Sequence, residues 1–146
     1  MTALIFRPAG PADISTIQLL DPLAVKGDEA RQEFIRRAVE QQACRVAILD
    51  DKIVGYAVLE YTFFSCGFIS MLYVHKDYRR QQVGQSLLAH LEQICNTPKL
   101  FTSTNLSNLP MQALLDRQGY LPSGVIHNLD EGDPELVYFK PLQPAP

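Results

Sequence analysis

The chain has 146 residues, of which 47% are hydrophobic and 20% are charged, and its net charge is -3. This composition is typical of a globular domain, and the small negative charge excludes a surface that attracts nucleic acid as a whole, so any anion site must be local. No apolar run reaches the length of a membrane span, and the stretch MTALIFRPAG lacks the layout of a signal peptide, so we expect a cytoplasmic protein without nucleic-acid or membrane partners.

Hydrophobic patterns divide the first half of the chain into short strands and amphipathic helices. Strands are indicated by runs of β-branched and apolar residues, and helices by apolar residues at a spacing of three or four. The predicted elements are, in order, a strand at 4–9, a helix at 12–20 with Asp13 as its N-cap, a helix with an apolar stripe at 34–39, a β-hairpin at 44–64 and a strand at 68–75.

The second half continues with the same alternation. Its predicted elements are a helix at about 83–95, a strand at 100–104, a helix from Asn108 to Gly119, and two strands within 120–129 and 135–140. The order β-α-α-β-β-β-α-β-α-β-β predicts an α/β (α+β) fold with a mixed, partly parallel central sheet of about seven strands flanked by helices on both faces. We expect a single domain over residues 1–140 and a disordered tail at 141–146, PLQPAP.

The turn HKDYRRQQ, residues 75–82, joins an apolar strand to a helix. A helix N-terminus attracts phosphate because its first N–H groups are unpaired and the helix dipole is positive there. Lys76, Arg79 and Arg80 add positive charge, and Gly84 has no Cβ to keep a ligand from the backbone. From the residues alone, two interpretations stay open: a pyrophosphate site and an ordinary turn with solvated basic side chains.

The pattern Arg79-x-x-x-x-Gly84 followed by QSLLAHL resembles the acetyl-CoA signature of the GNAT acyltransferase superfamily. That signature is Gln or Arg, two residues, Gly, one residue, then Gly or Ala, and here Gln82 replaces its first glycine. The resemblance implies that backbone amides of the turn hold the pyrophosphate of coenzyme A and that the preceding strand pairs with the pantetheine arm. The cofactor-binding residues that it implies are Leu72, Val74, Arg79, Arg80, Gln81, Gln82, Val83, Gly84, Gln85, Ser86, Asn105 and Asn108.

The stretch NLPMQALLDRQGY, from Asn108 to Tyr120, is similar to a later motif of the same family, in which Asn begins a helix and Gly-Phe or Gly-Tyr ends it. The predicted element order also matches the whole GNAT fold, from Ile5 to about Lys140. The resemblance therefore implies an N-acetyltransferase that moves an acetyl group from acetyl-CoA to a primary amine by direct attack. The acceptor is a small-molecule or peptide amine that the sequence does not identify, and a homodimer is expected because dimers are common in the superfamily.

A different class of function also fits these motifs. A coenzyme A-binding sensor or regulatory protein could use the same fold without turnover, and two departures from the family favour it. One is Gln82, and the other is Leu115, which stands where most members have a tyrosine that acts as general acid. A general nucleotide-binding module is a third interpretation, against which Asn105 and Asn108 argue.

The catalytic groups are less specified than the cofactor site. By resemblance, the backbone N–H of Val74 or of its immediate neighbour would polarise the acetyl carbonyl; the alternative is an amide paired within the sheet. Tyr73 and Tyr120 are the candidate proton donors in place of the missing tyrosine, although a packing role for either ring, in the core or at its rim, is favoured over catalysis. Glu60 is the candidate base, acting through water, although it could equally be a solvated carboxylate. The acidic turn at 130–135 either attracts a cationic amine or is simply solvated.

The three cysteines, Cys44, Cys66 and Cys95, are far apart and have no His or Cys neighbours at the spacing of a metal site. We therefore expect free thiols and no bound metal. A covalent acyl intermediate on Cys66 or Cys95 is not favoured, because nothing places either thiol beside a histidine.

Overall fold

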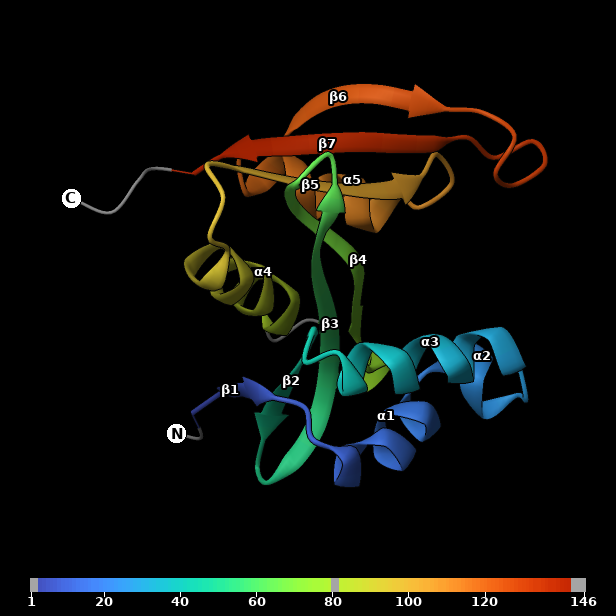
Figure 1. The fold of residues 1–146 in the computed structure, drawn as a ribbon, viewed down its shortest axis with the longest axis vertical. Coiled ribbons are helices and arrows are strands. Elements are labelled where there is room, and N and C mark those ends of the chain that lie inside the picture. The colour runs from blue at the N-terminus through green and yellow to red at the C-terminus, as the bar shows by residue number, and fades with distance from the viewer. Residues whose placement is uncertain (1–2, 80–81, 143–146) are drawn as a thin grey trace. The chain divides into compact units, whose positions relative to one another are not determined.

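The computed structural model describes residues 3–79 and 82–142. Within these residues the strands form a seven-stranded sheet in the order β1-β2-β3-β4-β5-β7-β6 (Figure 1). The elements are β1 Ile5–Pro8, α1 Ile14–Leu20, α2 Pro22–Val25, α3 Glu29–Glu40, β2 Cys44–Leu49, β3 Lys52–Phe63, β4 Cys66–Val74, α4 Val83–Ile94, β5 Lys99–Asn105, α5 Leu109–Arg117, β6 Leu121–Ile126 and β7 Glu135–Pro141.

The element order confirms the one predicted from the sequence, with one addition, the short helix α2. β4 and β5 are parallel, with Gly67–Ile69 opposite Leu100–Thr102, whereas β1-β2, β2-β3, β5-β7 and β6-β7 are antiparallel. The predicted mixed and partly parallel sheet is therefore confirmed. None of the helices in the described ranges is both long enough and apolar enough to cross a membrane.

The chain divides into two compact units, and each unit draws on two separate segments. Unit 1 consists of the residues up to Leu59 together with Met71–Leu91, and unit 2 consists of Glu60–Ser70 together with the residues from Glu92 onward. The division runs through β3, β4 and α4. The expected single domain over residues 1–140 stays a prediction. Ordered structure continues to Leu142, whose N–H donates to Pro98 O at 2.7 Å, and the rest of the expected tail lies outside the described residues.

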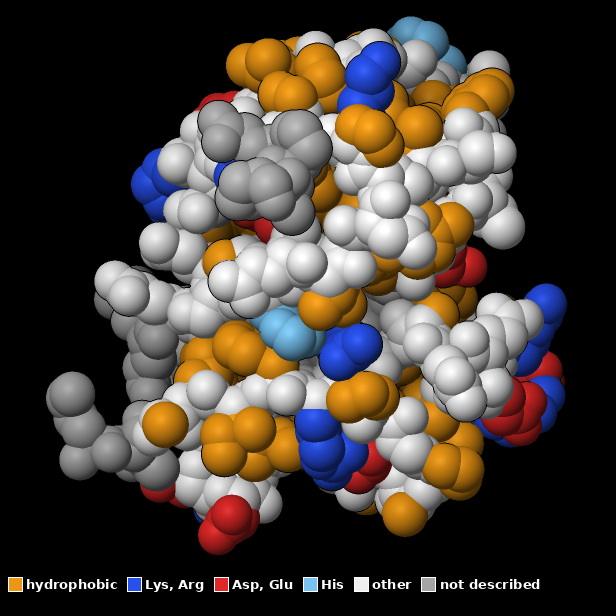
Figure 2. Space-filling model, turned by 60° about the vertical axis from the view of Figure 1, so that its left-hand side comes forward, with side chains coloured by type: hydrophobic (Ala, Val, Ile, Leu, Met, Phe, Trp, Pro, Cys, Tyr) orange, Lys and Arg blue, Asp and Glu red, His pale blue; other side chains and the backbone are white. Residues whose placement is uncertain are grey.

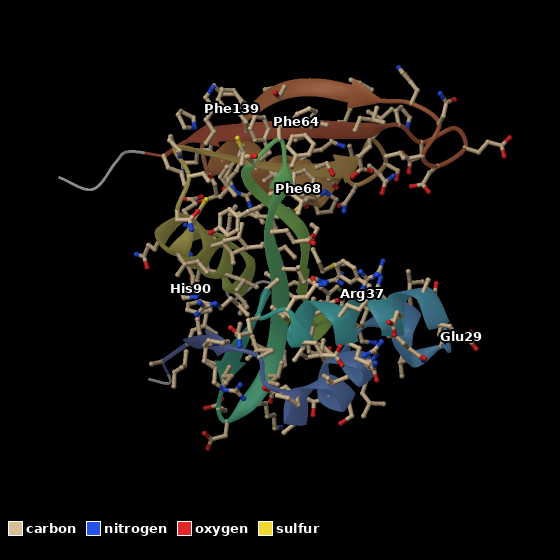
Figure 3. The ribbon with its side chains drawn as sticks, in the orientation of Figure 1. Glu29, Arg37, Phe64, Phe68, His90 and Phe139 are labelled. Carbon is tan, nitrogen blue, oxygen red and sulfur yellow. The ribbon has the colours of Figure 1, made fainter. Side chains whose placement is uncertain are left out.

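In unit 1, helices cover both faces of the sheet. Val46 and Tyr56, paired across β2 and β3, are fully buried in a core that α1 and α3 complete with Ile17 and Ile35. On the other face, the ring of Phe6 stacks on the ring of His90 from α4, with centroids 4.8 Å apart (Figure 3 labels His90). The expected helices on both faces are therefore present.

Asp13 occupies the predicted N-cap position of α1, but its side chain makes no capping hydrogen bond there. Its carboxylate accepts hydrogen bonds from Gly10 N–H at 2.8 Å and from the Arg7 guanidinium at 2.7 Å and 3.0 Å, and these bonds together with the Arg7 charge lower its pKa. The reason is local geometry: Asp13 ends a 3₁₀ helix at Pro11–Asp13 and already has helical backbone angles. An N-cap residue needs an extended backbone to reach the next free amides.

In unit 2, β5, β7 and β6 form an antiparallel sheet to which the first half of β4 adds in parallel. Phenylalanines follow one another across this sheet: Phe63 packs on Phe68 at 4.7 Å and on Phe101 at 5.2 Å, and Phe101 packs on Phe139 at 5.8 Å between centroids (Figure 3 labels Phe68 and Phe139). α5 begins at the predicted cap, because Asn108 Oδ1 accepts from Met111 N–H, and ends before Gly119, whose φ is 87°.

β6 is the edge strand of the sheet, and all six of its residues are exposed. Leu121, Val125 and Ile126 are 51%, 53% and 40% exposed, and Phe64, in the β3-β4 turn, is 87% exposed. Figure 2 shows hydrophobic side chains that reach the surface of one face among charged and other polar ones. Beside β6, a groove of about 450 Å³ lies between Phe63, Phe101 and Val125.

Candidate functional site

The basic turn begins where β4 ends at Val74. His75 Nδ1 accepts a hydrogen bond from Asp77 N–H at 3.1 Å, and this bond caps a 3₁₀ helix at Lys76–Tyr78. Tyr78 N–H donates to His75 O at 2.9 Å, and Lys76 is exposed. Of the expected site residues, Arg80 and Gln81 lie outside the described residues.

Gln82 has the left-handed backbone conformation that glycine favours, with φ of 61°. Its carbonyl accepts from Ser86 N–H at 3.0 Å, which is an i to i+4 bond at the start of α4. The N–H groups of Val83, Gly84 and Gln85 precede that bond, and such first-turn amides have no helical partner. Gln82 thus has a backbone conformation that glycine favours, at the position where the family signature has glycine, and Gly84 lies in the first turn of α4.

The left-handed Gln82 leads to a prediction about stability. Valine is strongly disfavoured at positive φ because of its branched Cβ, so Gln82→Val is expected to lower the free energy of unfolding by about 1–2 kcal/mol. Gln82→Gly removes the left-handed cost but adds chain entropy in the unfolded state, so we expect a change between zero and a gain of about 1 kcal/mol. Urea unfolding of the three proteins checks this order, which a Val variant as stable as the Gly variant would contradict.

The Arg79 side chain turns back to the end of β4. Its Nε–H donates to Val74 O at 3.0 Å, and its Cζ lies 5.4 Å from the ring centroid of Tyr73. On the neighbouring strand, a Cβ at Gly55 would lie only 2.8 Å from Tyr73 O, so glycine is needed for β3 and β4 to approach so closely. His75 N–H donates to Val54 O at 2.8 Å. The backbone around Val74 is therefore held by a strand on one side and by Arg79 on the other.

Unit 1 also contains a buried charged network of Asp21, Arg31 and Tyr56, which was not predicted from the sequence. Asp21 is fully buried; its Oδ2 accepts from Tyr56 Oη–H at 2.6 Å and from Arg31 Nη1–H at 2.9 Å, and its Oδ1 accepts from the Leu23 and Ala24 amides. Desolvation alone would raise the pKa of Asp21, but the bonds from Tyr56, Ala24 and Arg31 outweigh it and lower the pKa. The one sequence signal was Asp21 before Pro22, a typical start of a helix.

In unit 2, the expected polar residues are bonded to one another. Asn105 Nδ2 donates to Asp130 Oδ2 at 2.8 Å, and Ser107 Oγ donates to Asp133 Oδ2 at 2.6 Å. Glu135, also from the acidic turn, accepts from the Ser103 hydroxyl. Much of the acidic turn's charge therefore bonds polar groups of β5 and of the loop after it.

The candidate catalytic side chains are divided between the units. Tyr73 lies in unit 1, and Glu60, half-buried in β3, and Tyr120 lie in unit 2. Tyr120 is 2% exposed, and its hydroxyl donates to Glu92 Oε2 at 2.9 Å; burial and the Glu92 charge raise its pKa. Leu115 is fully buried.

The remaining expected cofactor residues are distributed along the same elements. Leu72 is half-buried in β4 and Val74 is buried at its end, while Val83 is buried at the start of α4. Gln85 is exposed and Ser86 is half-buried in the first turns of that helix. Among the described residues, no group of three or more His, Cys, Asp or Glu side chains is arranged to hold a metal ion.

Comparisons with known proteins assign the chain to a family. The model of the acetyltransferase (GNAT) family matches residues 12–120. A GNAT acetyltransferase structure from Bacillus cereus is 31% identical, with 97% of this chain and 99% of that chain covered and a TM-score of 0.89. The sequence matches none of the curated proteins with which it was compared.

Two more distant structures show the same fold. The ribosomal-protein-S18-alanine N-acetyltransferase from Escherichia coli is 17% identical, with 99% of this chain and 97% of that chain covered and a TM-score of 0.80. A Bacillus anthracis acetyltransferase in complex with acetyl coenzyme A is 21% identical, with 68% and 62% covered and a TM-score of 0.64. The resemblance inferred from the two sequence motifs is confirmed by the family model and the Bacillus cereus structure. The chain belongs to the GNAT acetyltransferase family and is therefore an acyl-CoA-dependent N-acyltransferase with acetyl-CoA as its cosubstrate.

Proposed function

We propose that the protein transfers an acetyl group from acetyl-CoA to a primary amine by direct attack of the amine on the thioester. The observation that carries this proposal is the turn after β4, in which the left-handed Gln82 opens α4 and leaves the amides of Val83, Gly84 and Gln85 before the first helical bond. Such amides and the helix dipole are suited to a pyrophosphate. Ser86, Arg79 and the undescribed Arg80 and Gln81 complete the proposed pyrophosphate site.

The remaining cofactor contacts follow from the same assignment. We place the pantetheine arm along Leu72 and Val74, with the Val74 N–H as donor to the acetyl oxygen, on which negative charge develops during attack. Asn105 Oδ1 and Asn108 Nδ2 are the proposed polar contacts in unit 2, because their other side-chain atoms already bond Asp130 and Met111 N–H.

Proton transfer needs little from the protein. A thiol has a pKa of about 8.5, so a thiolate can leave near neutral pH without a dedicated acid. Glu60 is the proposed base, which would draw the amine proton through water. Of the two candidate donors, Tyr120 already donates its hydroxyl proton in a hydrogen bond to Glu92.

The experiment that tests the proposal is calorimetric titration of the purified protein with acetyl-CoA, with ADP as the control. We expect acetyl-CoA to bind much more tightly than ADP, and we expect turnover in a subsequent screen of amines. Equal affinity for ADP would favour a general nucleotide-binding module. Tight acetyl-CoA binding without turnover of any amine would favour a coenzyme A sensor, the alternative suggested by Gln82 and Leu115.

The acceptor is proposed only as a class, a small-molecule or peptide amine. Two other expectations stay predictions: a cytoplasmic location and a homodimer that uses the last hairpin. The second is supported by the exposed edge strand β6, with its apolar residues Leu121, Val125 and Ile126.

A further inference from the structure

We propose that Tyr73 is a positioning residue for acetyl transfer, which acts through Arg79: the Tyr73 ring holds the Arg79 guanidinium, and Arg79 fixes the Val74 carbonyl and with it the cofactor turn. The inference rests on the proposed function, because it concerns how the turn is kept in the shape that accepts acetyl-CoA. It assigns Tyr73 a role for its ring, whereas a proton donor would use its hydroxyl.

Two contacts of Arg79 carry the first step. The guanidinium Cζ lies 5.4 Å from the Tyr73 ring centroid, within the range of a cation–π interaction, and the Nε–H donates to Val74 O at 3.0 Å. Both partners belong to the last two residues of β4, five and six positions before Arg79 in the chain. The Arg79 side chain therefore ties the residue after the 3₁₀ helix back to the end of β4.

The Tyr73 ring, which contacts Arg79, packs in turn against the core of unit 1. The Tyr73 ring contacts the Tyr56 ring, with centroids 6.3 Å apart and planes tilted by 48°. Tyr56 is fully buried and its hydroxyl donates to the buried Asp21 carboxylate at 2.6 Å. A continuous series of contacts thus runs from the Asp21 carboxylate through two aromatic rings to Arg79.

The opposite side of the same peptide is held by β3. Gly55 lets β3 come close to Tyr73 O, and His75 N–H donates to Val54 O at 2.8 Å. The peptide group between Val74 and His75 is therefore bonded at its carbonyl by Arg79 and at its N–H by Val54 O. Since catalytic donors must be placed to within a fraction of an ångström, loss of the Arg79 contact should disturb both cofactor affinity and the position of the Val74 N–H.

Substitutions that separate the ring from the hydroxyl test the role of Tyr73. Tyr73→Leu removes the ring, and we expect it to weaken acetyl-CoA binding about two- to fivefold, the range of a cation–π contact to an exposed arginine. Tyr73→Phe keeps the ring and is expected to restore most of that affinity, and its kcat is expected to stay within about threefold of the wild type. A Tyr73→Phe variant that binds acetyl-CoA normally but loses kcat about a hundredfold would identify a proton donor and overturn the proposal.

A double variant tests whether Tyr73 acts through Arg79. If it does, Tyr73→Leu adds little to the loss of affinity caused by Arg79→Ala, since the ring then has no guanidinium to hold. Losses that multiply in the double variant would show that Tyr73 acts independently, and would overturn the proposal.

Hydrogen exchange of the unliganded protein tests the same idea without the cofactor. The amides of His75, Asp77 and Tyr78 each donate a hydrogen bond. We expect Tyr73→Leu to speed the exchange of these amides, whereas Tyr73→Phe should leave their rates unchanged. The exchange rates of the α5 amides in unit 2 should be the same in all three proteins. Unchanged exchange in Tyr73→Leu would overturn the positioning role even if acetyl-CoA binds. Faster exchange in a protein that does not bind acetyl-CoA would instead contradict only the proposed function.

Discussion

Replacing Gly84 by glutamate is expected to weaken acetyl-CoA binding by about a hundredfold or more, with turnover lost in proportion. Gly84 is half-buried in the first turn of α4, among the amides proposed to hold the pyrophosphate. A glutamate there adds bulk at the backbone and a negative charge that repels the phosphates, in place of the attraction of a free helix end. Calorimetric titration with acetyl-CoA measures the loss, with thermal unfolding to show that the variant is folded.

A matched control makes the same chemical change elsewhere. Gly124→Glu in β6 meets no heavy atom within 4 Å of the added Cβ, so we expect a folded protein with unchanged acetyl-CoA affinity. Gly84→Gln then separates bulk from charge, and its loss should be smaller than that of Gly84→Glu. Equal losses in Gly84→Glu and Gly124→Glu would exclude the start of α4 as the phosphate site.

The choice of a control for Arg79→Ala shows what the structure adds to the sequence. By sequence, Arg31 is one of several arginines on a charged helix face and would serve as a neutral substitution. In the structure its guanidinium pairs with the fully buried Asp21 carboxylate at 2.9 Å, so Arg31→Ala would disturb the core. Arg117 is exposed at the end of α5 and makes a better matched control for an arginine-to-alanine change.

Features with a local signal were predicted well from the sequence. The order of strands and helices follows from hydrophobic spacing within each segment. The start of α5 at Asn108 and its end before Gly119 follow from a cap and a left-handed glycine that act within a few residues. The left-handed backbone at Gln82 was not predicted, although the family signature has glycine at that position.

Features that depend on distant partners were not predictable in the same way. Asp21 and Tyr56 are 35 residues apart, and the sequence around neither residue indicates that they form a hydrogen bond. Arg79 was interpreted as a phosphate ligand alone, since its return to Val74 O depends on the shape of the whole turn. The four residues of α2 are too few for a helical hydrophobic period to be visible.

The second large effect is expected at Asp21, where Asp21→Ala should lower the free energy of unfolding by about 3–5 kcal/mol. The substitution leaves the buried Tyr56 hydroxyl and the amides of Leu23 and Ala24 without their acceptor, and it leaves Arg31 without its counter-ion. Urea unfolding measures the loss. A smaller loss, about 1–3 kcal/mol, is expected for Arg31→Ala, because the Asp21 carboxylate then keeps three of its four donors.

The pH dependence of stability distinguishes the Asp21 charge from its packing. The folded-state pKa of Asp21 is lowered, so its contribution is fully present above the pKa of an unfolded aspartate, about 3.9, and is lost as the pH falls through the lower folded-state value. Asp21→Asn keeps the shape of the side chain but removes this titration, so its stability deficit should be largest above about pH 4 and should shrink under more acidic conditions. A deficit that stays constant as the pH is lowered would show that the loss comes from the changed hydrogen bonding of the amide and not from the charge of the carboxylate. In that case the series from Asp21 to Arg79 would depend on packing of the Tyr56 and Tyr73 rings and not on a buried charge.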